Sequence, residues 1–149
     1  MKLEDEIKQK IFQSQKHKLV VNILYTSGWL GTMHARFFKS HGITSQQFNI
    51  LRILRGQHGK PATIGLLQER MLDKMSNASR LVEKLKQKSL VDRKECAQDR
   101  RQMDVSITDK GLALLKKLDT ELESEQQILN TLSDTEAQTI NDLLDKMRG

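Results

Sequence analysis

The sequence is poor in the residues that mark several large classes of protein. Its 149 residues include one cysteine, Cys96, and one proline, Pro61. A single cysteine cannot form a disulfide within the chain, so the chain is not a small disulfide-stabilised fold. Aromatic residues make up 4% of the chain, and Leu, Lys, Glu and Gln dominate, which favours a mainly α fold over an all-β one.

Long hydrophobic runs are also missing, as are the common catalytic motifs. No run of 18 or more apolar residues offers a membrane span, and the first ten residues are too charged for a signal peptide, so we expect a cytoplasmic protein. The motifs GxSxG, HExxH, GxGxxG and the P-loop are absent. Metal-ligand spacing is absent among His17, His34, His41 and His58. We therefore expect neither an enzyme nor a bound metal or cofactor.

Positive charge is concentrated in the first 111 residues. The formal net charge is +6, but residues 1–111 carry ten more basic than acidic residues, whereas residues 112–149 carry four fewer. A basic body suits a polyanionic partner such as DNA, and an acidic tail suits a protein contact. The alternative is a basic surface that is solvated and has no partner.

The first part of the chain predicts two helices. Leu3, Ile7 and Ile11 recur every four residues, a narrow stripe that predicts a packing arm along another helix. A longer helical pattern follows and should end near residues 41–42. Small residues around Gly28 allow this helix to bend or to approach another backbone closely.

The middle of the chain predicts three short helices. A capping box of Thr44 and Gln47 starts the first helix. A second helix follows Thr63, and after a break at residues 72–74 a third has its apolar face at Ala78, Leu81, Val82 and Leu85. Two short helices joined by a tight turn are a helix-turn-helix candidate.

Residues 90–107 change to an extended pattern. Residues 90–96 are extended in character, residues 97–102 are polar, and Met103, Val105 and Ile107 alternate strictly with polar residues. The pattern predicts a β-hairpin directly after the helix-turn-helix, where a wing is found.

The C-terminal part returns to helical spacing. Leu115, Leu122 and Leu129 lie seven residues apart, a seam that normally meets another helix. Ser133 and Glu136 form a second capping box, which starts a short amphipathic helix. The predicted fold is a single domain, mainly α with a small β-hairpin wing.

The third short helix carries a polar face opposite its apolar one. That face and its flanks hold Ser76, Asn77, Ser79, Arg80, Glu83, Lys84 and Gln87. Serine, asparagine and glutamine can hydrogen-bond to base edges or phosphates, and an arginine can bind a guanine or a phosphate through two parallel hydrogen bonds. This composition predicts a DNA-reading surface, and the alternative is a solvated helix face.

The expected wing tip contains Asp99, Arg100 and Arg101. Folding does not require two adjacent guanidinium groups there, and a narrow minor groove attracts inserted arginine side chains. Asp99 is expected to hold an arginine side chain in position through a bidentate ion pair. The alternative is a charged hairpin tip that only keeps the chain soluble.

These motifs together resemble those of a known family. The segment SNASRLVEKLKQKSLVDRKECAQDRRQMDVSITDKG, residues 76–111, resembles the recognition helix, wing and following helix start of the MarR (multiple antibiotic resistance regulator) family. Arg80 with the leucines after it, the wing sequence Asp99-x-Arg101 and residues 108–111 fall where that family places them. The resemblance covers nearly the whole chain, and the wing motif is its most specific part.

The resemblance implies a winged helix-turn-helix transcriptional regulator that acts as a homodimer. Residues 1–149 would be one MarR-like domain, with residues 44–107 as the DNA-binding lobe and residues 1–42 and 108–149 as dimerisation helices. Arg101 would enter the minor groove, oriented by Asp99. The major groove or its phosphates would be faced by Ser76, Asn77, Ser79, Arg80 and Lys84. We expect a repressor on a pseudo-palindromic operator whose half-site centres lie about 10 bp apart.

The resemblance also implies regulation by a small molecule. Similar regulators release DNA when a small, often aromatic or phenolic, effector enters a crevice between the dimer helices and the winged lobe. In this chain the crevice would involve Tyr25, Trp29, Met33, His34, Phe37, Phe48 and Arg52. The alternative is that these are ordinary core residues. Some family members sense oxidants through an N-terminal cysteine, but Cys96 lies in the wing and is expected to be a packing residue.

A second function stays open, because a fold does not dictate its use. A winged-helix protein can instead serve protein-protein contacts or bind DNA without sequence specificity. A steep salt dependence would indicate phosphate contacts, which release counterions on binding.

Overall fold

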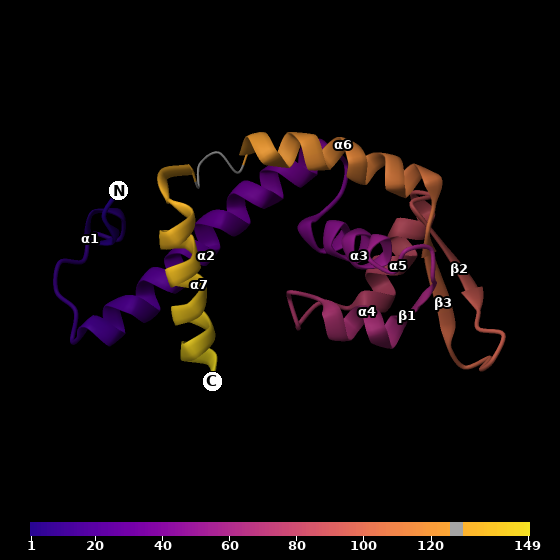
Figure 1. Ribbon diagram of the computed structural model, residues 1–149, viewed down its shortest axis with the longest axis horizontal. Coiled ribbons are helices and arrows are strands. Elements are labelled where there is room, and N and C mark those ends of the chain that lie inside the picture. The colour runs from indigo at the N-terminus through magenta and orange to yellow at the C-terminus, as the bar shows by residue number, and fades with distance from the viewer. Residues whose placement is uncertain (126–129) are drawn as a thin grey trace.

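The computed structural model describes residues 1–125 and 130–149 of the chain. A long helix, α2 (Gln15–Ser40), leads into a lobe of short helices, and α6 (Asp109–Glu125) runs back over that lobe. The last helix, α7 (Asp134–Arg148), returns toward α2. The wing projects at one end of the molecule and both termini lie at the other (Figure 1).

The lobe combines three helices with a small antiparallel sheet. Its helices are α3 (Ser45–Arg55), α4 (Ile64–Arg70) and α5 (Ala78–Gln87). Its strands are β1 (Ala62–Thr63), β2 (Val91–Glu95) and β3 (Met103–Ile107), in the order β1-β3-β2. The mainly α fold with a hairpin wing is confirmed. The sequence does not predict β1, because two residues are too few to show an alternating pattern.

The predicted helix boundaries follow from capping. The Gln47 amide donates to Thr44 Oγ1 and the Thr44 amide donates to Gln47 Oε1, each at 3.1 Å. Ser133 and Glu136 form the same reciprocal arrangement at the start of α7, so both predicted capping boxes are confirmed. Helix α2 ends at Ser40, just before the expected boundary, and runs through Gly28 without a break.

The lobe has a continuous apolar core. Its largest fully buried side chains belong to Ile50, Leu51, Leu54, Leu67, Met71, Val82, Leu85, Val91, Val105, Leu115 and Leu118. Leu115 and Leu118 come from α6, and Leu122 packs against the same cluster. The seam predicted from Leu115 therefore packs on the chain's own lobe over its first two turns, because α6 lies against α3. Leu129 lies outside the described residues.

The predicted N-terminal packing arm is helical only at its start. Helix α1 spans Leu3–Glu6, and the residues after it leave the helix, with Lys8 at a φ of 53°. Leu3 is buried, but Ile11 is 85% exposed. Polar contacts to α2, from Lys18 to Glu4 and from the Tyr25 hydroxyl to Glu6, hold α1 in place. An apolar stripe one residue wide buries too little surface to extend the helix further.

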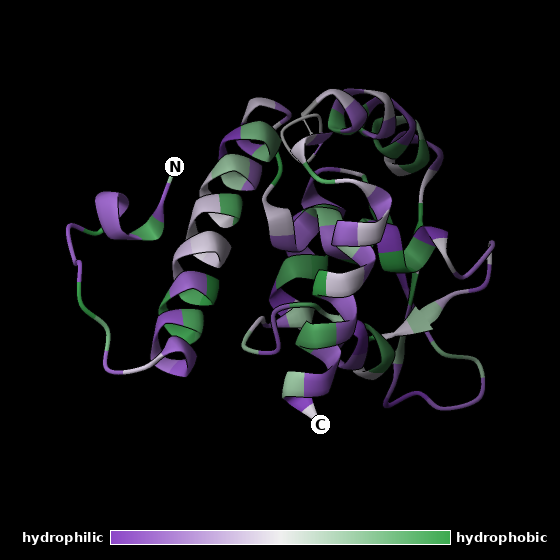
Figure 2. Cartoon of the chain, turned by 60° about the vertical axis from the view of Figure 1, so that its left-hand side comes forward, coloured by the Kyte–Doolittle hydropathy of each residue, from purple (hydrophilic) through white to green (hydrophobic). Residues whose placement is uncertain are grey.

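The outer helices leave apolar side chains uncovered. Leu24 of α2 is 68% exposed and Leu143 of α7 is 60% exposed. Apolar and polar residues recur along both helices (Figure 2). None of the helices within residues 1–125 and 130–149 combines the length and the apolar character that a bilayer span requires.

Candidate nucleic-acid interface

Helix α5 is built as an amphipathic helix with a defined start. Asn77 is its N-cap, and its side-chain Oδ1 accepts a hydrogen bond from the Arg80 amide at 3.0 Å. The side that faces the core holds Ala78, Val82 and Leu85. The Ala78 amide donates to Gln68 Oε1 at 3.0 Å, which ties α5 to the end of α4. The buried side of α5 and its N-cap together determine which residues of the helix point away from the core.

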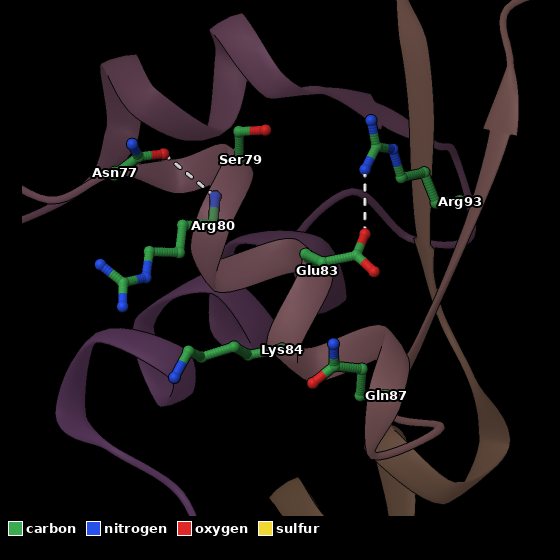
Figure 3. A pocket seen from close by; sticks show the side chains of 7 residues that line it. All are labelled: Asn77, Ser79, Arg80, Glu83, Lys84, Gln87 and Arg93. Carbon is green, nitrogen blue, oxygen red and sulfur yellow. Dashed lines mark hydrogen bonds and ion pairs between the residues drawn. The ribbon is translucent and has the colours of Figure 1, made fainter.

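The outward side of α5 forms a shallow polar hollow of about 400 Å³ (Figure 3). It is lined by Asn77, Ser79, Arg80, Glu83, Lys84, Gln87 and Arg93. Arg80 and Lys84 are exposed, and both side chains extend away from the wing strand that carries Arg93. Their two positive charges lie on the same side of the helix.

Two of the residues expected to face DNA lie at the edge of this exposed face. The Asn77 side-chain oxygen accepts the helix-cap hydrogen bond, so its amide nitrogen and the second lone pair of that oxygen remain for a ligand. Ser76 is half-buried, and its hydroxyl oxygen has no hydrogen-bond partner among the described residues. Ser76 lines a neighbouring hollow of about 370 Å³ at the start of α3. The structure thus places Ser79, Arg80 and Lys84 on the exposed face, with Ser76 and Asn77 at its edge.

Arg93 belongs to this face although the sequence does not single it out. It lies on β2, and its guanidinium Nη1 donates to Glu83 Oε2 at 3.1 Å. Glu83 is on the polar face predicted from the sequence, but only the fold brings the wing strand next to it. The sequence offered only a basic residue within a polar strand as a signal, and such residues are common on surfaces.

The wing tip lies between β2 and β3. The Cys96 amide donates to the Gln102 carbonyl and the Gln102 amide to the Asp99 carbonyl, both at 3.0 Å. Asp99 Oδ1 accepts a hydrogen bond from the Arg101 amide at 2.9 Å. The predicted ion pair between Asp99 and an arginine side chain is not formed within the described residues. Asp99 instead shapes the turn, because a short carboxylate reaches the backbone two residues ahead most easily.

The guanidinium groups of Arg100 and Arg101 are consequently presented to solvent. Both residues are exposed, and neither forms an ion pair in the part of the chain that is described. An ordered turn that displays two unpaired cations is suited to a polyanion.

Cys96 is half-buried at the base of this turn and is not in a disulfide. Its partial burial fits the packing role expected from the sequence. Within residues 1–125 and 130–149, no three His, Cys, Asp or Glu side chains gather in a way that would hold a metal ion.

The residues expected to form one effector crevice are divided between two hollows. His34, Phe48 and Arg52 line a hollow of about 540 Å³ that is also lined by residues of α6. Tyr25, Trp29 and Met33 line a separate hollow of about 490 Å³ on α2. Phe37 lines neither of them, and its ring lies 5.1 Å from the Phe38 ring and 4.8 Å from the His41 ring.

The hollow beside α6 has an aromatic wall and a cation. The Phe38 and Phe48 rings are stacked with centroids 4.4 Å apart, and the Arg52 guanidinium lies 6.0 Å from the Phe48 centroid. Arg55 donates two hydrogen bonds to Asp119, at 2.6 and 3.2 Å, which link α3 to α6 along the same hollow. Such a site suits a small aromatic molecule that carries a negative or partly negative group.

Tyr25 is held by a contact within the chain. Its hydroxyl donates to Glu6 Oε2 at 2.7 Å, and this hydrogen bond to a carboxylate raises the pKa of Tyr25. The same hydrogen bond ties α1 to α2.

The amino-acid sequence of the lobe is similar to that of a known protein family. The model of the MarR family matches residues 41–102, from the end of α2 to the end of the wing turn. The chain is 28% identical over 116 residues to the HTH-type transcriptional regulator PecS of Dickeya dadantii (strain 3937), which covers 75% of this chain and 69% of PecS. It is 27% identical over 108 residues to the HTH-type transcriptional regulator MhqR of Bacillus subtilis (strain 168), covering 72% of this chain and 73% of MhqR. The lobe is thus similar in sequence to the MarR family, and most of the chain is similar to two HTH-type transcriptional regulators.

Solved structures share the MarR-family fold over most of the chain. A mutant MarR from E. coli complexed with operator DNA is similar with a TM-score of 0.75 at 20% identity, covering 99% of each chain. The organohalide-sensing RdhR regulator in its 2,4-dichlorophenol-bound form is similar with a TM-score of 0.79 at 19% identity, covering 94% of this chain and 85% of that one. Both structures share the fold of this chain, and its relatives PecS and MhqR are HTH-type transcriptional regulators.

Proposed function

We propose that this protein is a homodimeric repressor of the MarR family that binds a pseudo-palindromic operator and has no catalytic activity. The observation that carries the proposal is the pairing of two cationic groups on one lobe. Arg80 and Lys84 are exposed on α5, and Arg100 and Arg101 are exposed at the wing tip. A helix that enters a major groove beside a wing that enters the adjacent minor groove uses this arrangement.

The residues take different roles in this proposal. Arg80 is suited to bind a guanine or a phosphate through two hydrogen bonds, whereas Lys84 and Ser79 are suited to phosphate oxygens. Arg101 enters the minor groove, with Arg100 beside it. Asn77 and Ser76 stay at the edge of the contact, and Asp99 shapes the turn that presents the arginines.

The uncovered apolar faces support a homodimer. On α2 they include Leu19, Val20 and Leu24, and on α7 they include Ile140, Leu143 and Met147. A second copy of the chain covers both faces when the ends of two chains pack around a two-fold axis. The DNA-binding lobe then comprises residues 44–107, and residues 1–42 and 108–149 connect the subunits, although the start of α6 also completes the lobe core.

The test is selection of bound sequences from a pool of random duplex DNA at two salt concentrations. The native chain should retain a two-fold symmetric motif whose half-site centres lie about 10 bp apart, with affinity that falls steeply with salt. Arg101→Ala should lose affinity while keeping its fold. Lys116→Ala, which removes an exposed charge from α6, is the matched control and should bind normally. Salt-sensitive binding without any motif would favour architectural DNA binding, and no DNA binding would favour a protein partner.

We further propose that the hollow beside α6 binds a small aromatic or phenolic effector that releases DNA. The stacked phenylalanine rings and Arg52 provide the chemistry, and the hollow lies between the lobe and the helices that lead to the other subunit. An effector bound there acts only if its affinity differs between the DNA-bound and released forms. RdhR, which has the same fold, was solved with 2,4-dichlorophenol bound.

The effector is tested by titrating 2,4-dichlorophenol into the complex with the selected operator. Release at micromolar to millimolar concentrations is expected, and Arg52→Gln should raise the concentration needed. Arg36→Gln removes the same charge from the other hollow and should have no effect. The reverse pattern would assign the effector to the hollow on α2.

A further inference from the structure

The face of α5 that is turned outward contains one acidic side chain, Glu83, whose position is unexpected for a surface that meets phosphates. A carboxylate there repels the DNA backbone unless a cation compensates it. Its Oε2 accepts a hydrogen bond from Arg93 Nη1 at 3.1 Å, so the compensating cation comes from wing strand β2 (Figure 3). In the part of the chain that is described, no other ion pair joins α5 to the wing.

Arg93 lies at the point where the wing leaves the lobe. Before it, Leu90 and Val91 are buried in the core, and after it Lys94 and Glu95 are exposed. The Arg93 side chain is 27% exposed and the Glu83 side chain 50% exposed. A cation that has lost most of its water needs a nearby counter-charge, and Glu83 supplies it.

The two edges of α5 therefore have different charges and contacts. Arg80 and Lys84 extend away from the wing, whereas Glu83 points toward Arg93 (Figure 3). The Glu83 carboxylate is engaged with the wing and is poorly placed to read a base. The pair connects the helix proposed for the major groove to the hairpin proposed for the minor groove.

We propose that Glu83 and Arg93 are positioning residues that fix the angle between the reading helix and the wing. The proposal rests on the proposed function, because the angle matters only when both elements meet DNA. Asp99 lies six positions after Arg93, and at about 3.3 Å per residue the wing is a lever of about 20 Å. A rotation of about 10° at its base moves the tip by about 3.5 Å, which is more than the length of a hydrogen bond.

The first test measures the wing angle without DNA. Spin labels are placed at Gln98→Cys in the wing turn and at Glu69→Cys on α4, in a Cys96→Ser background, and labelled chains are diluted with unlabelled ones. The native pair should give a narrow distance distribution, and Glu83→Gln should broaden it. The exchanged variant Glu83→Arg with Arg93→Glu should narrow it again, since it restores the ion pair. An unchanged width in Glu83→Gln would overturn the proposal.

The second test measures coupling in DNA binding. Arg101→Ala should weaken operator binding about tenfold in the native background but only about twofold with Glu83→Gln, because a misplaced wing has little contact left to lose. Lys84→Gln on the opposite edge is the matched control. The fold-loss of operator affinity in the double variant Lys84→Gln with Arg101→Ala should equal the product of the losses in the two single variants. Independent effects of Glu83→Gln and Arg101→Ala would contradict the proposal.

The two measurements separate this proposal from the proposed function. If the label distances respond as expected but the native chain binds no DNA, the positioning pair stands and the proposed function fails. If the native chain selects an operator but the distances and the coupling do not respond, the positioning pair is refuted and the operator-binding proposal is unaffected. Thermal unfolding of Glu83→Gln and of the exchanged variant checks that both remain folded.

Discussion

The winged lobe and the two ends of the chain bury their apolar residues to different extents. In the lobe, side chains such as Leu51, Leu67 and Leu85 are completely buried among residues of the same chain. On α2 and α7, Leu24 and Leu143 are mostly exposed. The lobe is complete within one chain, whereas the ends carry a surface that a second chain is proposed to cover.

Helix α6 belongs to both regions. Leu115 and Leu118 are part of the lobe core, while the end of α6 leads toward α7. Arg55 binds Asp119 through two hydrogen bonds, and His41 Nε2 lies 2.7 Å from Glu121 Oε2. These contacts join α6 to the end of α2 and to α3.

The largest effect is expected from a cavity in the lobe core. Leu85→Ala should lower the free energy of unfolding by about 2–5 kcal/mol, because Leu85 has no exposed surface and its neighbours cannot fill the space. Urea denaturation measures this loss. Leu112→Ala, which removes a partly exposed leucine from α6, should cost far less. Equal costs would mean that the lobe is not the closed unit described above.

A smaller loss is expected where the lobe joins α6. A Cβ on Gly111 would lie 2.4 Å from the Leu90 carbonyl oxygen and 2.7 Å from Ile107 Cγ1. Gly111→Ala should therefore destabilise the chain by about 1–3 kcal/mol, since backbone and side chain must shift. Gly65→Ala is the control, because a Cβ there meets only Thr63 Oγ1 at 3.9 Å and alanine favours a helix. Thermal unfolding of both variants compares them, and an unchanged Gly111→Ala would contradict this close approach.

Self-association should depend on the uncovered face of α7. Leu143→Glu should weaken the dimer at least about tenfold, about 1.4 kcal/mol, because the substitution buries a charge at the proposed subunit contact. Asn141→Glu introduces the same charge on α7 outside its apolar face and should leave the dimer intact. Sedimentation velocity over a range of concentrations distinguishes the two. An intact dimer for Leu143→Glu would place the subunit contact elsewhere.

The smallest effect concerns pH and the start of α7. Hydrogen bonds from the Ser133 amide and hydroxyl lower the pKa of Glu136 below its usual range. A carboxylate whose pKa is lowered by folding stabilises the fold at pH values above its ordinary pKa in the unfolded chain. This stabilisation is lost as the pH falls through the lowered pKa of the folded chain. Amide exchange in the first turn of α7 should therefore accelerate under acid conditions, and Glu136→Gln should remove that pH dependence. A carboxyl NMR titration of Glu136 without the shift would contradict the cap.

Much of the lobe was predictable from local patterns. The capping box at Thr44, the apolar face of α5 and the alternation in β3 each specify an element within a few residues. Outside the lobe, the capping box at Ser133 does the same for α7. The exposed positions of Arg80 and Lys84 on α5 follow from the same helical period. The wing turn was located correctly, but the contact of Asp99 was not, because its nearest partner is a backbone amide that sequence patterns do not show.

Contacts between distant elements were not predictable. The sequence shows a seam that starts at Leu115, but it does not say whether the partner is α3 or another chain, since either can offer an apolar surface. It likewise shows aromatic residues on α2 and α3, but not that they line two separate hollows.

Local sequence patterns specified where α3 and α7 begin, which face of α5 is apolar, and that two arginines occupy the wing turn. These depend on short-range capping and on periodicity, which act within a few residues. The three-dimensional packing of the elements brings Arg93 to Glu83, places α6 on the lobe core, and sets which apolar residues remain uncovered. Such contacts depend on how whole elements pack, and a linear pattern does not contain that geometry.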